Sequence, residues 1–103
     1  MKMLTLIVHT DVQQKLADLL RTLAQVSGFT FSHVEGHGIE VESDVFLSAR
    51  DTVVGYIPRI RTDILLEDAD VAVVLARLCN KENCMTGQGI YWITPVDKGG
   101  HLL

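Results

Sequence analysis

The sequence predicts an α+β fold in which two helices cover one face of a four-stranded antiparallel sheet. Four segments rich in β-branched, aliphatic or aromatic residues are typical of strands, and two segments place apolar residues at helical spacing. The six segments follow one another in the order β-α-β-β-α-β, which is the ferredoxin-like arrangement. The length of 103 residues suits one compact domain, so residues 1–103 are expected to form a single unit.

The first half of the chain supplies a strand, a helix and a second strand. Residues 2–8 are almost continuously apolar, and a strand that is apolar on both sides needs cover on both faces. Thr10 or Asp11 is the expected cap of a helix that continues to about residue 26, with its apolar residues in one stripe. After a glycine, residues 29–35 alternate between two faces as a strand does.

A long segment separates the second strand from the third. Gly36 and Gly38 interrupt the strand pattern, and residues 39–54 combine several acidic residues with scattered apolar ones. Segments longer than ~12–15 residues without regular structure are uncommon inside a compact domain and are usually functional or mobile. We therefore predict a long mobile excursion at about residues 36–55.

The second half of the chain supplies a strand, a helix and the last strand. Residues 56–66 are expected to form the third strand, which carries charged side chains on one face: Arg59, Arg61 and Asp63. Residues 67–79 have acidic side chains in the first turn and an arginine near the end, which suits the dipole of a helix. The last strand is expected over residues 89–96. Apolar residues of the first and last strands remain on the face without helices, which favours a symmetric homo-oligomer.

The composition argues against several classes of protein. The formal net charge is -4, whereas a nucleic-acid partner requires a basic surface. No apolar stretch approaches the ~20 residues that span a bilayer, and the first residues lack the pattern of a signal peptide. We therefore expect a cytoplasmic protein whose two cysteines, Cys79 and Cys84, are reduced. No acid–base pair, nucleophile triad or ligand cluster of recognisable spacing occurs, so a non-enzymatic role is expected.

A glycine turn precedes the last strand, with the sequence Thr86-Gly87-Gln88-Gly89. Glycine allows backbone N–H groups to approach an anion without a side chain in the way. Glycines in such positions form ordinary turns more often than anion sites. The turn therefore predicts an anion site only in combination with other features.

Together with this turn, three other segments resemble the PII family of signalling proteins. Residues 36–38, Gly-His-Gly, are similar to the family's Gly-Phe-Gly, and the span from Gly38 to Pro58 fits the length of its T-loop. Residues 56–64, Tyr-Ile-Pro-Arg-Ile-Arg-Thr-Asp-Ile, are similar to Phe-Leu-Pro-Lys-Val-Lys-Ile-Glu-Ile. Residues 86–89 occupy the place of the B-loop, so the resemblance covers nearly the whole chain.

The PII resemblance implies a homotrimer with three clefts between subunits. Each cleft would bind a nucleotide or another small effector, and an adenine nucleotide is one candidate. The resemblance also implies that the T-loop reports the effector to a partner protein. Matched residue by residue, it implies effector contacts from Gly36, His37, Gly38, Glu40, Arg59, Asp63, Thr86, Gly87, Gln88, Gly89 and Lys98.

Three departures from the family pattern change what the effector can be. Ile90 stands where nucleotide-binding members have the B-loop lysine, and Lys98 alone stands in the tail where they have paired arginines. Thr52 stands at the tyrosine that some bacterial members uridylylate, so that modification is not expected. Because a triphosphate needs several cations or a magnesium ion, the departures argue against tight ATP binding. They leave a smaller anion, a mono- or dinucleotide-type ligand or a metal ion.

A metal-responsive trimer similar to the CutA proteins is the alternative. It would bind a divalent metal through histidine or cysteine side chains: His9, His33, His37, His101, Cys79 and Cys84. The histidines are scattered along the chain, and the Cys-x4-Cys spacing is looser than that of the usual zinc pairs. The sequence keeps both hypotheses open, and a screen of nucleotides against divalent metals distinguishes them.

Overall fold

The structure is a computed structural model that describes residues 1–37, 57–80, 82, 85 and 87–103. Most of the predicted excursion at residues 36–55 lies outside the described residues. So do several residues that the sequence analysis singled out: Gly38, Glu40, Thr52, Cys84 and Thr86.

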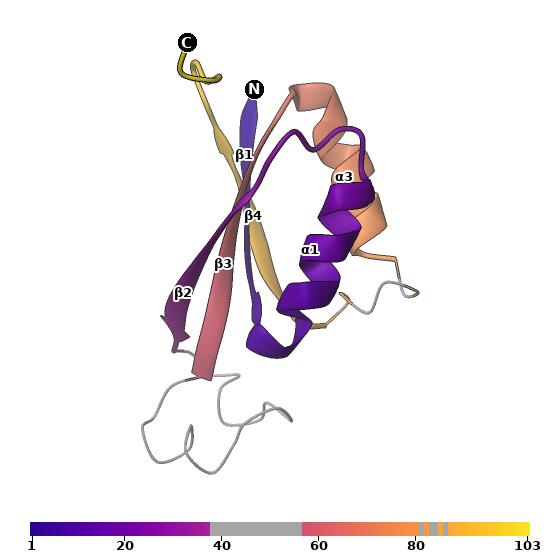
Figure 1. The fold of residues 1–103 in the computed structure, drawn as a ribbon, viewed down its shortest axis with the longest axis vertical. Helices are drawn as coiled ribbons and strands as arrows, with labels where there is room; N and C mark the ends of the chain where they lie inside the picture. Colours follow the sequence, from indigo (N-terminus) through magenta and orange to yellow (C-terminus); the bar gives the residue numbers. More distant parts are fainter. Residues whose placement is uncertain (38–56, 81, 83–84, 86) are drawn as a thin grey trace.

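Within the described residues, four strands and two α-helices follow one another in the predicted order (Figure 1). The strands are β1 (Lys2–His9), β2 (Thr30–Gly36), β3 (Ile57–Leu66) and β4 (Gly89–Pro95). The α-helices are α1 (Gln13–Thr22) and α3 (Val71–Leu78). Each helix is preceded by a short 3₁₀ turn, η1 (Thr10–Val12) or η3 (Asp68–Asp70).

The strands form one antiparallel sheet in the order β2-β3-β1-β4, so β1 and β3 are central and β2 and β4 are edges. Both helices lie on the same face of this sheet (Figure 1). The predicted α+β fold with a ferredoxin-like order of elements is therefore confirmed. No helix in the described part of the chain has the length and apolar character needed to cross a membrane.

The first helix differs from its prediction at both ends. It ends at Thr22 rather than near residue 26, because Leu23 has the extended backbone angles φ -91° and ψ 118°. The 3₁₀ turn η1 that leads into it is capped by His9, whose Nδ1 accepts a hydrogen bond from the Asp11 N–H at 3.1 Å. The predicted cap at Thr10 or Asp11 is wrong, because both residues lie within η1 and the N-cap residue of α1 is Val12, which makes no side-chain cap hydrogen bond.

The hydrophobic core lies between the two helices and the sheet face that they cover. Alternate residues of the central strands point into it, which is the period expected of strands. Its most buried strand residues are Leu4, Leu6, Val8, Ile60, Ile64 and Leu66. Its most buried helix residues are Leu16, Leu20, Val74 and Leu78. Burial of a leucine stabilises a fold by about 1.5–3 kcal/mol, so this layer fixes the helices against the sheet.

Thr62 of β3 is a polar exception within the core. It is 0% exposed, and its Oγ1 has no hydrogen-bond partner in the described part of the chain. An unsatisfied buried hydroxyl costs about 1–3 kcal/mol, so we expect Thr62→Val to raise the free energy of unfolding by about 1 kcal/mol. Urea unfolding of the wild-type protein and of Thr62→Val measures this difference.

Thr5 of β1 provides the matched control for this substitution. It is 1% exposed, but its hydroxyl donates a hydrogen bond to Asp63 Oδ1 at 2.8 Å. Thr5→Val removes that bond and is expected to lower stability. A loss of stability in Thr62→Val as large as in Thr5→Val would contradict the assignment of Thr62 as unsatisfied.

The sheet face opposite the helices, which we call the open face, mixes apolar and charged side chains. The register places Thr5 between Asp63 of β3 and Trp92 of β4 on this face. Every residue of β4 is exposed, including Trp92 at 40% and Ile90 at 59%. Within the described residues, no helix packs over the open face (Figure 1). Large apolar side chains therefore remain in contact with solvent in the single chain.

Candidate functional site

Several predicted effector contacts gather at one end of the sheet, where β1 and β2 end and β3 and β4 begin. Arg59 of β3 pairs with His9 of β1 on one side and with Val34 of β2 on the other. The His9 N–H donates a hydrogen bond to the carbonyl oxygen of Gln88 at 3.1 Å. This bond joins the glycine turn to the same end of the sheet as the arginine.

Gly36 is the β2 residue that makes room for the side chain of Arg59. A Cβ atom at position 36 would lie 2.8 Å from Arg59 Cγ and 3.1 Å from the carbonyl oxygen of Ile57. The first of these distances is too short for carbon atoms, so the arginine stem would have to move. A glycine at this position therefore allows the half-buried arginine to lie flat across the end of β2.

Both glycines of the turn before β4 have structural roles. Gly87 has a φ of 80°, in the left-handed region that disfavours side chains. A Cβ at Gly89 would overlap the backbone of β1, with Val8 Cα only 2.9 Å away. The turn is closed by the Gln88 N–H, which donates to the carbonyl oxygen of Met85 at 3.1 Å. These contacts support the turn-forming role, and an anion site at this turn stays a prediction.

Asp63 makes its contacts on the open face, away from the glycine turn. Its Oδ1 accepts a hydrogen bond from the Thr5 hydroxyl at 2.8 Å, and its Oδ2 lies 3.1 Å from Arg61 Nε. The Arg61 guanidinium carbon lies 5.8 Å from the centre of the Trp92 ring, within the range of a cation–π interaction. Asp63 and Arg59 share a face as predicted, but these contacts pair Asp63 with Arg61.

His9 belongs to the same end of the sheet, although sequence reasoning did not include it among the effector contacts. It is 4% exposed, and its Nδ1 accepts a hydrogen bond from the Asp11 N–H. Its position as the last residue of the first strand is the signal that could have identified it. The end of a central strand adjoins two neighbouring strands at once.

The candidate metal ligands do not converge within the described part of the chain. His37 Nε2 lies 3.4 Å from Glu35 Oε2 at the exposed end of β2. Three other candidates are exposed on separate segments: His33 on β2, Cys79 after α3 and His101 in the tail. No group of three histidine, cysteine, aspartate or glutamate side chains is suitably placed for a metal ion among the described residues.

Lys98 lies at the opposite end of the sheet from the glycine turn. The Val96 N–H donates to the carbonyl oxygen of Met1 at 3.1 Å, so the tail starts beside the beginning of β1. Here a hydrogen bond from the N-terminal ammonium lowers the pKa of the Asp68 carboxyl. At ~3.3 Å per residue, β1 separates its two ends by roughly 20 Å. Within one chain, Lys98 and Arg59 are therefore too far apart to contact one small ligand.

Comparisons with known proteins agree with this fold. The model of a family described as "Protein of unknown function (DUF3240)" matches residues 1–103. The crystal structure of a DUF3240 family protein from Shewanella baltica OS155 has a TM-score of 0.76 and 25% sequence identity. That match covers 99% of this chain and 96% of the other. No curated protein matches the chain, and the resemblance to PII proteins stays a prediction. The chain belongs to the DUF3240 family.

Proposed function

We propose that the protein is a PII-like regulatory module without catalytic activity. It binds a small effector, a nucleotide or another anion, in clefts between the subunits of a homotrimer. The segment at about residues 36–55 relays the bound state to a partner protein. The observation that most supports this proposal is the placement of Gly36, Arg59 and the turn at residues 87–89 at one end of the sheet.

Arg59 is the cation that the proposal assigns to the effector. Arg59 lies at the sheet end, with its stem against Gly36, and it is half-buried. A partly desolvated guanidinium binds carboxylate or phosphate groups more strongly than a fully solvated one, and it can do so with two parallel hydrogen bonds.

The proposed effector contacts of one chain lie at opposite ends of the sheet, which supports a cleft that is formed by two subunits. A single chain supplies the glycine turn and Arg59 at one end and Lys98 at the other. A second copy, packed through the open face or the β4 edge, would bring further cations to the same ligand. The exposed apolar residues of β4 give such packing a driving force.

A thermal-shift screen with charge-removal variants tests the effector site. The ligands are AMP, ADP, ATP, a dinucleotide, inorganic phosphate and the divalent ions of zinc, copper and nickel. We expect one of the anions to raise the midpoint, because a ligand that binds the native state stabilises it. Arg59→Ala should weaken that anion about ten- to a hundredfold, since a charged hydrogen bond contributes ~1.5–3 kcal/mol.

Arg21→Ala is the matched control for the loss of one positive charge. Arg21 lies on α1 with its side chain 66% exposed, away from the sheet end. Its removal should leave the affinity unchanged. Equal weakening in both variants would contradict an Arg59 contact. Stabilisation by a divalent metal but by no anion would overturn the anion site and favour the CutA-like alternative.

A further inference from the structure

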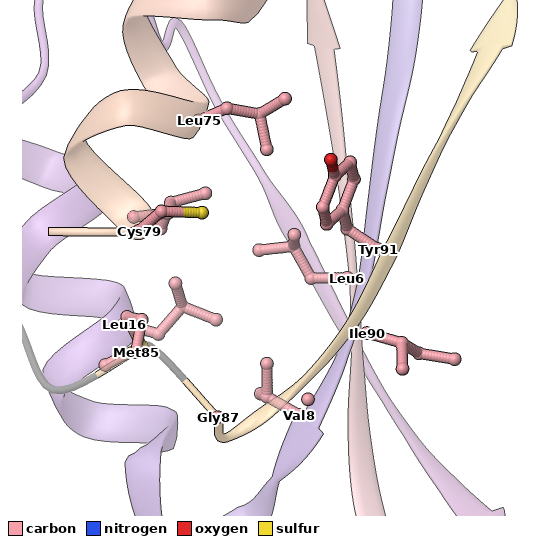
Figure 2. Close-up of a pocket in the computed structure, with 11 residues that line it drawn as sticks. Leu6, Val8, Leu16, Leu75, Cys79, Met85, Gly87, Ile90 and Tyr91 are labelled. Carbon is pink, nitrogen blue, oxygen red and sulfur yellow. The ribbon is translucent and has the colours of Figure 1, made fainter.

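An apolar pocket of about 210 Å³ opens between the two helices and the helix-facing side of β1 and β4 (Figure 2). Its walls include six large side chains: Leu6, Val8, Leu16, Leu75, Leu78 and Tyr91. We propose that this pocket binds a small apolar molecule, or the apolar end of a larger one, about the size of a single aromatic ring. The inference does not rest on the proposed effector site.

Two glycines of the turn line the pocket and leave this part of its wall without side chains. Gly87 and Gly89 both lie against the space, and a Cβ at Gly89 would meet the backbone of β1. Side chains at positions 91 and 93 of β4 point towards the helices, because these residues pair with helix-facing residues of β1. Tyr91, the next helix-facing residue, is 53% exposed and stands at the side of the pocket (Figure 2).

The chemistry of the walls selects an apolar ligand. Aliphatic side chains from three different elements face the space, and water in such a space would find few hydrogen-bond partners (Figure 2). Engineered cavities of ~150 Å³ with similar linings stay dry and bind benzene, so a space of this size accommodates one ring.

Two polar side-chain groups border this apolar space, and they set where a polar end of the ligand would lie. Tyr91 and Cys79 both line the pocket, and the Cys79 sulfur points towards its interior (Figure 2). A phenolic hydroxyl can both donate and accept a hydrogen bond, whereas a thiol does both weakly. The preferred ligand therefore carries one hydroxyl or carbonyl group directed at Tyr91.

The pocket and the proposed effector site lie on opposite sides of the sheet. Arg59 and Asp63 belong to the register positions of the open face, together with Thr5 and His9. The pocket is lined by Leu6 and Val8, the positions of β1 that face the helices. The two sites meet only at the glycine turn, so a substitution deep in the pocket leaves the contacts of Arg59 intact.

Toluene and phenol are the probes for the pocket, added to the wild-type protein while its methyl NMR signals are recorded. We expect saturable shifts that are confined to the leucine and valine methyl groups of the pocket walls. Phenol should bind several-fold more tightly than toluene, and Tyr91→Phe should remove that preference. Leu75→Trp, which fills the pocket from its rim, should weaken both probes at least tenfold.

Val73→Trp is the matched control, since Val73 is on the same helix but 43% exposed. It should leave the binding of both probes unchanged. Absence of saturable shifts, or equal weakening by Leu75→Trp and Val73→Trp, would overturn the inference. Binding of toluene only after the oligomer is dissociated would also overturn it, because the pocket would then be occupied by a second copy of the chain.

Discussion

Gel filtration coupled to light scattering is expected to report three times the 11.4 kDa chain mass for the wild-type protein and one chain mass for Ile90→Glu. Ile90 is 59% exposed and lies on the open face of the edge strand β4. In the single chain a glutamate at this position stays in water, so the substitution changes the stability of the fold little. In an assembly that covers the open face, the same carboxylate is buried without a partner, which costs several kcal/mol.

Val73→Glu is the control for this substitution. Val73 is a comparably exposed apolar residue, but it lies on α3, away from the open face. It should leave the mass of the assembly unchanged. A wild-type protein that elutes as a monodisperse monomer would contradict both the trimer and a cleft between subunits. A trimer that survives Ile90→Glu would place the interface elsewhere on the molecule.

The second large effect is expected at Gly89, where Gly89→Ala should lower the free energy of unfolding by about 3 kcal/mol. The added methyl group would overlap the backbone of β1 near Val8, and neither backbone can move without breaking ladder hydrogen bonds. Overpacking of a rigid site typically costs 1–3 kcal/mol and occasionally more. Urea unfolding measures the loss, and the pocket at this end of β4 should be distorted in the variant.

Substitutions of two other glycines serve as controls for the stability loss expected in Gly89→Ala. Gly87→Ala meets no neighbour within 4 Å but must adopt a φ of 80°, so we expect a smaller loss of about 1 kcal/mol. Gly28→Ala has open space around it and no positive φ, so it should be neutral or slightly stabilising. If the three substitutions cost the same, steric contact with β1 is not the reason for the glycine at position 89.

The candidate site was predictable only in part. The sequence placed Gly36, Arg59 and the glycine turn in one site through the PII resemblance, and the register brings these residues to one end of the sheet. It also grouped Lys98 with them, whereas the chain carries Lys98 to the opposite end. The resemblance matches positions along the sequence of a family. The distance between two residues within one subunit depends on the direction of the strands, and β4 carries the chain from the glycine turn to the opposite end of the sheet.

The sequence also predicted the face on which charged side chains lie, but not the partners that they contact. The four-residue spacing of Arg59 and Asp63 correctly predicted a shared face. It did not predict that Asp63 would accept a hydrogen bond from Thr5, which is 58 residues away along the chain. The choice of partner depends on which strand lies beside β3, and strand order is a property of the folded sheet.

The sequence by itself determined the six elements, their order and the faces that they bury. These depend on local periodicity, because apolar residues at period two or 3.6 form a strand or a helix wherever they occur. The tertiary structure decided the partner of Asp63, the position of Lys98 and the need for a glycine at position 89. Each of these depends on contacts between segments distant in sequence, which exist only once β1 lies between β3 and β4.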